Sequence, residues 1–99
     1  MGQDSLRVIA RVKARVDKGD ELQAVLLGLI APTRQEPGCI TYEMLQNKED
    51  ATEFTFVEEW TDEAALESHF GTSHIQDALK KFPNLLAEEL DLRRYVLVA

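Results

Sequence analysis

A stripe of aromatic residues around one carboxylate is the most informative feature of the sequence. Phe54, Phe56, Glu58 and Trp60 alternate along the chain, so a β-strand would place all four side chains on one face. Such a stripe is ordinary aromatic core with Glu58 at its margin, or it is an apolar cleft for a flat ligand. In the second interpretation Trp60 lies at the mouth of the cleft and Glu58 tunes a nearby base.

His69 offers a second chemical group, at the edge of an apolar helix face and next to Phe70. Its side chain is either a core-edge histidine with one satisfied nitrogen or a proton acceptor that faces a pocket. Imidazole suits the second role because its ordinary pKa is closest to neutral.

The spacing of the histidines does not favour a metal site. His69 and His74 are five residues apart, which on one helix separates them by about 140°, and Gly71 interrupts the helix between them. A shared ion would need a spacing nearer i, i+4 and a third ligand. The single cysteine, Cys39, excludes an internal disulfide and a Cys-based metal site, and no base lies near it in sequence. We expect Arg93 and Arg94 to be solvated or ion-paired.

Composition limits the function classes. The 99 residues form one domain, residues 1–99, and 18 acidic against 11 basic residues give a net charge of −7. Nucleic acid and membrane surfaces are therefore not expected partners. The glycines form neither GxGxxG nor GxxxxGK, which excludes a dinucleotide-binding domain. The start of the sequence lacks a basic region followed by a long apolar run, so we expect a cytoplasmic protein without a secretory signal.

Hydrophobic periodicity predicts the elements that would position these residues. Period two over 6–14 predicts a strand, and helical spacing follows over 20–33, with Asp20 and Gln23 resembling a capping box and Pro32 kinking or ending the helix. Two further strands, 39–45 and 53–60, should pair as a hairpin around the polar turn 47–51.

The second half of the sequence predicts two short helices and a last strand. Thr61 can cap a helix that ends at Gly71, with Ala65, Leu66 and His69 on its inner face. A further helix should run from Ser73 to 79 or 82, before Pro83, and the last strand should cover 90–98.

The order β-α-β-β-α-β predicts an α+β, ferredoxin-like fold with a four-stranded antiparallel sheet. Its helices can cover only one face of the sheet. The other face would carry Ile9 and Val57 and needs a cover. A second copy of the chain is the simplest cover, so we expect a symmetric homodimer.

Residues 34–76 resemble the antibiotic biosynthesis monooxygenase (ABM) family, within the dimeric α+β barrel superfamily. The resemblance rests on ordered motifs: R-x-E-P-G-C at 34–39, Tyr42-Glu43, F-x-x-x-E-x-W at 54–60, D-E-A-A-L-E-x-H at 62–69, and Ser73-His74. It implies a dimeric barrel with a pocket between sheet and helices. It also implies, for several members, oxidation of quinols or polyphenolic aromatics by O₂ without metal, flavin or haem.

The same resemblance assigns the pocket tryptophan to Trp60 and the helix histidine to His69. Phe56 stands where aromatic-oxidising members can place an amide, which leaves no obvious group to stabilise a phenolate. Val12 stands where haem-degrading members carry asparagine, which speaks against haem degradation.

These observations favour a cofactor-independent monooxygenase or oxidase of a small quinol-like aromatic, with O₂ as co-substrate. His69 would accept the proton, Trp60 would stack on the ring and Glu58 would tune the base. The residues expected to bind substrate are Val8, Val12, Phe56, Leu66, Phe70, His74 and Leu79.

Two alternatives remain open. An isomerase of a small phosphorylated metabolite would need Lys80, Lys81 or Arg94 to point inward. A non-catalytic ligand-binding dimer would have its pocket filled by side chains such as Phe56 and Phe82.

Overall fold

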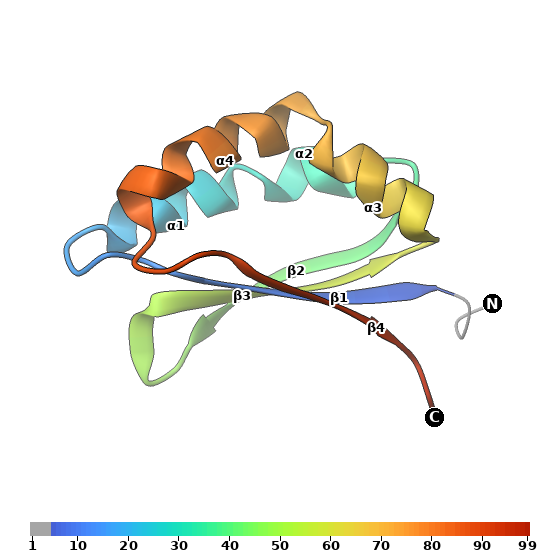
Figure 1. Cartoon of the computed structure of the whole chain (residues 1–99), viewed down its shortest axis with the longest axis horizontal. Coiled ribbons are helices and arrows are strands. Elements are labelled where there is room, and N and C mark those ends of the chain that lie inside the picture. The colour runs from blue at the N-terminus through green and yellow to red at the C-terminus, as the bar shows by residue number, and fades with distance from the viewer. Residues whose placement is uncertain (1–4) are drawn as a thin grey trace.

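A computed structural model of the chain describes residues 5–99, and it places helices on one side of a sheet (Figure 1). Residues 1–4, on which the expectation of no secretory signal partly rests, lie outside the described residues. The elements in chain order are β1 (Leu6–Lys13), α1 (Gly19–Leu27), α2 (Ile30–Arg34), β2 (Cys39–Asn47), β3 (Asp50–Trp60), α3 (Glu63–Phe70), α4 (Ser73–Leu85) and β4 (Asp91–Val96).

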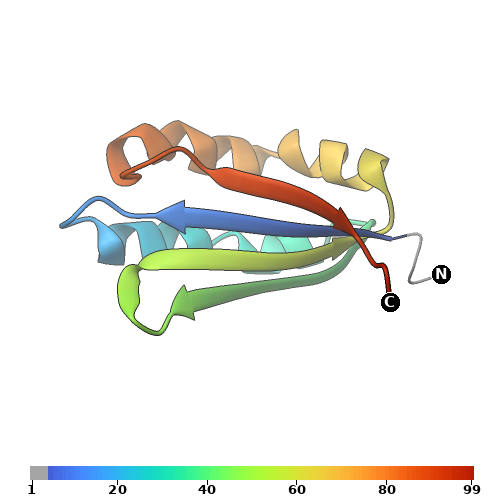
Figure 2. The ribbon, with the colours of Figure 1, turned by 60° about the horizontal axis from the view of Figure 1, so that its bottom comes forward.

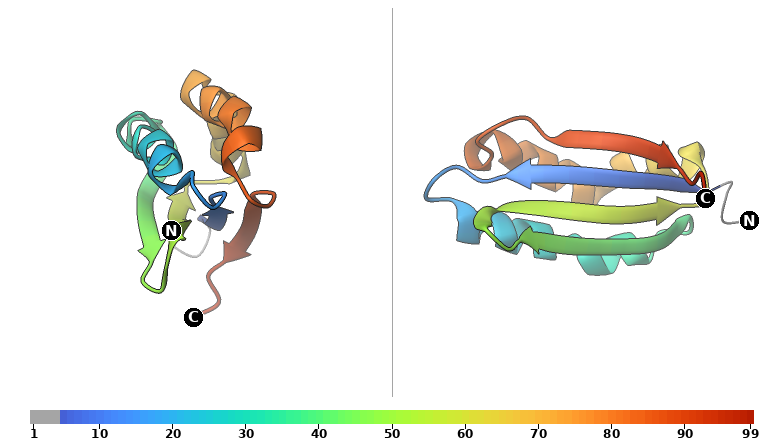
Figure 3. Two further views of the ribbon diagram at one scale, coloured as in Figure 1. Left: turned by 90° about the vertical axis from the view of Figure 1, so that its left-hand side faces the viewer. Right: turned by 90° about the horizontal axis from the view of Figure 1, so that it is seen from below.

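The four strands form one antiparallel sheet in the order β2-β3-β1-β4 (Figure 2). In this arrangement β1 and β3 are central, and Leu6 lies between Trp60 of β3 and Val96 of β4. Seen from below in Figure 3, one face of the sheet has no helix over it. The predicted ferredoxin-like α+β fold is confirmed. We call the helix-covered side the inner face and the other side the open face.

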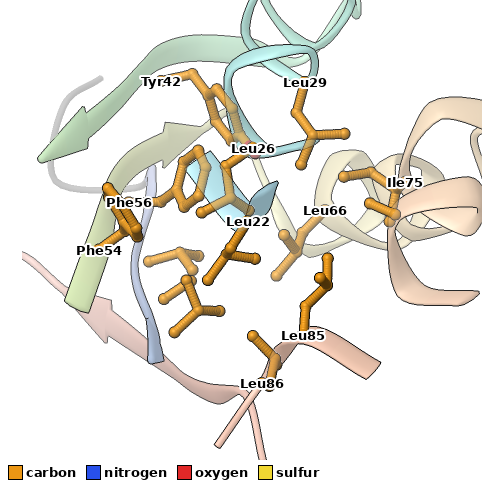
Figure 4. Packing of buried hydrophobic residues seen from close by; sticks show 14 of the residues in the cluster. Leu22, Leu26, Leu29, Tyr42, Phe54, Phe56, Leu66, Ile75, Leu85 and Leu86 are labelled. Carbon is orange, nitrogen blue, oxygen red and sulfur yellow. The ribbon is translucent and has the colours of Figure 1, made fainter. Parts of the chain in front are cut away.

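The alternation of β1 and β3 sets the core. Leu6, Val8, Ala10 and Val12 are buried on the inner face, while the residues between them are only partly buried. The aromatic stripe of β3 shares that face. Figure 4 shows Phe54 and Phe56 directed toward the leucines of α1. Burying such side chains contributes about 1.5 to 3 kcal/mol each.

The predicted helix over 20–33 is two helices. α1 ends at Leu27, and α2 begins at Ile30 after Gly28 and Leu29. Pro32 lies in the first turn of α2, where a missing backbone N–H removes no bond within that helix. The predicted capping box is wrong: Lys18 is the N-cap without a side-chain cap bond, and Asp20 lies in the first turn.

The caps of the next two helices also differ from the prediction. The N-cap of α3 is Asp62, not Thr61, and its side chain accepts a hydrogen bond from the Ala65 N–H at 2.8 Å. Thr72 caps α4. This helix continues beyond 82 to Leu85, with Pro83 inside its last turns.

The strand bounds differ from the predicted ones at their ends. β2 and β3 are longer than expected and meet at Asn47 and Asp50, so the turn between them is only Lys48-Glu49. β4 is shorter than predicted, Asp91–Val96 instead of 90–98. β2 also has an irregularity between Cys39 and Thr41, which leaves Ile40 half exposed. No helix in residues 5–99 has the length and apolar character needed to cross a membrane.

Gly38 fixes the contact between the start of β2 and helix α3. A Cβ at this position would lie 2.2 Å from the Ala65 Cβ and 3.0 Å from Thr61 Oγ1. The Gly38 carbonyl also accepts a hydrogen bond from the Thr61 N–H at 2.9 Å. Only glycine permits this approach, and the contact holds the preceding residues, including Glu36, against α3.

Candidate functional site

A small cavity lies between the inner face of the sheet and the helices. Its volume is about 50 Å³ and its lining is almost entirely apolar. Three polar side chains take part in the lining: Tyr42, Glu58 and His69. Its other lining residues are Ala10, Val12, Leu26, Leu29, Phe56, Phe70, Ile75, Ala78, Leu79, Phe82, Leu90 and Leu92.

Glu58 is a buried carboxyl group at the wall of this cavity. It is 4% exposed, and its Oε1 accepts a hydrogen bond from Trp60 Nε1 at 2.8 Å. Burial raises the pKa of Glu58 to about 7, against the lowering effect of the Trp60 hydrogen bond, and the charge of Glu36 adds to the rise. Near neutral pH this group therefore exchanges a proton, which is the property of a group that takes part in acid–base chemistry.

His69 lines the cavity from the last turn of α3 and is 3% exposed. Its Nδ1 lies 2.8 Å from Glu36 Oε2. Because a carboxylate oxygen only accepts, Nδ1 carries a proton, and in the neutral ring Nε2 then keeps its lone pair. Within residues 5–99, Nε2 has no hydrogen-bond partner. Burial lowers the pKa of His69, although the hydrogen bond and charge of Glu36 act in the opposite direction.

Both histidines of the sequence meet on the same carboxylate oxygen. His74 Nε2 lies 2.7 Å from Glu36 Oε2, and the two imidazole rings are 6.2 Å apart. The separation of about 140° that one continuous helix would give does not apply, because α3 ends at Phe70 with Gly71 as its C-cap. The chain turns there, Thr72 Oγ1 donates to the His69 carbonyl at 2.7 Å, and the first turn of α4 brings His74 back beside His69.

The loop before β2 supplies Glu36 through local bonds. The Glu36 N–H donates to the Thr33 carbonyl at 3.0 Å, and the Glu36 carbonyl accepts from the Cys39 N–H at 3.1 Å. Arg34 donates through Nε and Nη2 to the Tyr42 carbonyl, at 3.1 and 2.8 Å, and thereby ties the loop to β2. The R-x-E-P-G-C stretch is thus the element that holds a carboxylate against two histidines.

The structure gathers some of the predicted site residues and separates others. His69, Glu58, Val12, Phe56, Phe70 and Leu79 line the cavity, whereas Val8, Leu66, Trp60 and His74 do not. Trp60 is not at the mouth of a cleft, because it is 0% exposed and its Nε1 donates a hydrogen bond to the buried Glu58. Its ring centroid is 4.6 Å from that of His69, so it supports the histidine from within the core.

Two site residues were missed by the sequence analysis, Glu36 and Tyr42. Both stand in motifs that carry the family resemblance, and this was the one signal that could have drawn attention to them. Tyr42 is 3% exposed and its ring packs 5.0 Å from that of Phe56 and 5.8 Å from that of His69. Burial raises the pKa of Tyr42, so its phenol stays protonated and can donate a hydrogen bond.

The remaining charged candidates point away from the cavity. Lys80, Lys81 and Arg94 are exposed and do not line it, which removes the inward cation that an isomerase of a phosphorylated metabolite would need. Arg94 pairs with Glu63 and Glu67 of α3, and Arg93 pairs with Asp91, so the ion-paired interpretation of these arginines is confirmed.

The site can therefore hold and move a proton in a water-poor setting. It combines a neutral imidazole, oriented by a carboxylate, with a second carboxyl group whose pKa is about 7. Such a pair is suited to abstracting a proton from a small, mostly apolar molecule. Glu36, His69 and His74 also form a group of potential metal ligands, whose ligand atoms all lie within 4.8 Å of one another.

Known proteins are similar to this chain in sequence and in fold. The chain is 35% identical over 92 residues to the protein sll1783 of Synechocystis, an alignment that covers 93% of this chain but only 63% of the cyanobacterial protein. It is 31% identical over 85 residues to a Bacillus subtilis protein named "Putative monooxygenase YcnE", covering 86% of this chain and 90% of that protein.

Among solved structures, PA3566 from Pseudomonas aeruginosa superposes with a TM-score of 0.93 at 30% identity, covering 100% of this chain and 99% of that chain. The family described as "Antibiotic biosynthesis monooxygenase" matches residues 5–81, which includes the strand, loop and helices that build the site. This match spans most of the sequence and agrees with the resemblance carried by its motifs. The chain belongs to the antibiotic biosynthesis monooxygenase family.

Proposed function

We propose that this protein oxidises a small quinol-like aromatic molecule with O₂, as a monooxygenase or oxidase that needs no cofactor. The observation that carries the proposal is His69, whose Nδ1 is held by Glu36 while its ring lines an apolar cavity beside Glu58. Membership of a family described by monooxygenase activity supports the reaction class.

The proposed reaction begins with proton transfer from a quinol hydroxyl to His69 Nε2. The resulting anion is a strong enough reductant to pass one electron to O₂, which gives superoxide and a semiquinone. Transfer of a second electron, of the remaining hydroxyl proton and of the proton held by His69 completes the oxidation, so that quinol and O₂ become quinone and hydrogen peroxide and His69 is neutral again. In the monooxygenase outcome, the oxygen adds to the ring and the products are a hydroxyquinone and water.

The residues contribute position and charge to this step. The Glu36 carboxylate stabilises the imidazolium that forms when His69 takes the proton, because the two groups are 2.8 Å apart. Glu58 and Tyr42, on the same wall, can hydrogen-bond to the second hydroxyl of the ring. The apolar lining strengthens each of these interactions by excluding water.

The cavity must open before a ring can bind. Its volume is about 50 Å³, whereas an engineered cavity that binds benzene has about 150 Å³. Leu79, Phe82 and Leu90 separate it from a surface hollow of about 390 Å³, because they line both spaces. Phe82 is half-buried and is the largest of the three, so its rotation is the step we expect to admit substrate.

The small volume favours a second candidate function, a non-catalytic dimer that binds a small ligand. In that case Phe56 and Phe82 fill the space permanently and no ring enters. The two candidates differ in one observable, since only the first predicts oxygen uptake above the rate of autoxidation.

An oxygen electrode with a panel of hydroquinones tests the proposal at neutral pH, where autoxidation is slow. We expect His69→Ala to lower kcat/KM by about 100- to 10,000-fold, the usual contribution of a general base. Glu36→Gln should lower it less, because the imidazole remains but loses its stabilising charge. Asp77→Asn is the control, since Asp77 is exposed on α4 and does not line the cavity. Equal rates for the parent and His69→Ala would reject the proposed role.

We also propose that a second copy of the chain covers the open face. Ile9 and Val57 pair directly across β1 and β3 and are only partly buried. Around them, Arg11 is neutralised by Glu53 at 2.9 Å, and Tyr95 is 46% exposed. A mixed apolar and ion-paired face of this kind suits a homodimer. Light scattering coupled to gel filtration should give twice the chain mass, and Val57→Lys should give the monomer; a monomeric parent would refute the dimer.

A further inference from the structure

We propose that Glu36, His69 and His74 form a binding site for one divalent transition-metal ion, a site that shares Glu36 and His69 with the proposed reaction. The site follows from side chains that the fold brings together from α3, α4 and the loop before β2. It includes both histidines of the sequence, and both are within hydrogen-bond distance of the same oxygen of Glu36.

The ligand set is chemically well defined. Two imidazole nitrogens and one carboxylate oxygen suit zinc and the neighbouring first-row metals, and they leave at least one coordination position for water or another ligand. With bonds of about 2.1 Å to nitrogen and oxygen, a tetrahedral ion holds its ligand atoms about 3.4 Å apart. The three ligand atoms lie within 4.8 Å of one another.

Small side-chain movements would admit the ion. The two distances from Glu36 Oε2, 2.8 Å to His69 Nδ1 and 2.7 Å to His74 Nε2, must open by about 0.6 to 0.7 Å to reach the tetrahedral separation. The two nitrogens must come closer to each other. The least constrained ligand is His74, whose side chain is 21% exposed, and Glu36 is 11% exposed. The buried His69 can keep its place.

Glu36 and His74 are both partly exposed, so an ion can approach these two ligands from the surface. Glu36 and Thr72 line a surface hollow of about 380 Å³, which also contains Asp62 at its wall. Thr72 Oγ1 lies 3.2 Å from His74 Nε2, a contact that coordination of an ion through Nε2 would replace, because that nitrogen would then carry no proton. The net charge of −7 further concentrates cations near the protein.

Metal binding would reverse the hydrogen-bonding character of the cavity nitrogen. An ion on Nδ1 displaces the proton that now lies between His69 and Glu36. A neutral ring then carries its proton on Nε2, which becomes a donor instead of an acceptor. The bound form can therefore not use His69 as a proton acceptor, so the metal would switch the proposed reaction off. This consequence rests on the proposed function, whereas the binding itself does not.

Isothermal titration calorimetry of the tag-free chain with Zn²⁺ tests the site. We expect one ion per chain with a Kd below about 10 μM. Glu36→Gln and His74→Ala should each weaken binding at least about 100-fold, since even changes to outer partners of a metal site cost about 10- to 100-fold. Asp77→Asn and Cys39→Ser should bind as the parent does. They control for an exposed carboxylate on the helix of His74 and for the one thiol of the sequence.

Histidine NMR supplies a readout that does not depend on activity or on variants. Adding Zn²⁺ to ¹⁵N-labelled parent should convert His69 from the Nδ1–H to the Nε2–H form and shift His74 at the same stoichiometry. Absence of one-per-chain binding would overturn the proposal. Binding that leaves the His69 tautomer unchanged, or that survives in both Glu36→Gln and His74→Ala, would overturn it as well. Thermal melting of each variant shows whether it is folded.

Discussion

Glu58→Gln should make the protein more stable at alkaline pH and leave it unchanged at acidic pH. Glu58 is 4% exposed and burial raises its pKa from 4.5 to about 7. The pKa of Glu58 is higher in the folded than in the unfolded chain. Its contribution to the free energy of unfolding is therefore complete below pH 4.5 and is lost as the pH rises through 7. Glutamine has no proton to lose, and its amide oxygen can still accept the Trp60 N–H.

The size of the effect follows from the shift. A rise of the Glu58 pKa from 4.5 to about 7 corresponds to about 3 kcal/mol of unfolding free energy. Of this, about 2 to 3 kcal/mol is lost between pH 5 and pH 8. This is a large share of the about 5 to 15 kcal/mol that stabilises a typical domain. In urea it corresponds to a difference of about 1 to 2 M between the midpoints of the variant and the parent at pH 8.

Urea denaturation, followed by the fluorescence of the single tryptophan, measures this difference. Trp60 is 0% exposed in the folded chain, so its emission reports unfolding. The lowered pKa of His69 has the opposite effect, because the contribution of His69 to stability is lost as the pH falls below 6.5. This effect is the same in the parent and in the variant, so it cancels in the difference between them. Glu67→Gln, at a side chain that is 71% exposed, controls for net charge. A variant-minus-parent difference that does not change between pH 5 and pH 8 would refute the assignment of a raised pKa to Glu58.

Three further substitutions test the fold and the way into the cavity. Gly38→Ala should destabilise the protein by about 1 to 3 kcal/mol, because its Cβ would lie 2.2 Å from that of Ala65; an unchanged melting temperature would contradict this close approach. Asp62→Ala should lower the unfolding free energy, measured by chemical denaturation, by about 1 kcal/mol, because the α3 cap is lost. Asp62→Asn should keep most of the stability that the cap provides. Phe82→Ala should join the cavity of about 50 Å³ to the neighbouring hollow and tighten the binding of phenol, measured by calorimetry; unchanged affinity would show that Phe82 does not separate the two spaces.

The hydrophobic pattern of the sequence was sufficient to predict the sheet, because buried and partly buried residues alternate along its central strands. The period-two pattern around Val8 on β1 and Phe56 on β3 predicted which side chains share the inner face, and the register confirms it. The helix break at Gly28 was not predicted, since Leu26 and Leu29 continue a helical spacing across it. Periodicity records which residues are buried, and it does not record whether the backbone between them stays helical.

The site was predicted less completely than the fold, because it depends on contacts between distant parts of the sequence. Glu36 is 33 residues from His69, and nothing in its neighbourhood reveals that it faces two histidines. The meeting of His69 with His74 depends on the chain turn at Gly71, where helical spacing no longer applies. Likewise, period two placed Trp60 on the correct face, but only the packing around it determines that it is fully buried.

The tautomer of His69 at neutral pH tests the central claim most directly. With two histidines in the sequence, a long-range ¹H–¹⁵N correlation spectrum of the labelled, metal-free protein resolves both rings without ambiguity. The proposed chemistry predicts a neutral His69 at pH 7 with its proton on Nδ1 and an unprotonated Nε2 toward the cavity. Observation of the Nε2–H form, or of an imidazolium at this pH, would contradict it, because neither leaves a nitrogen on the cavity side that can accept a proton from substrate.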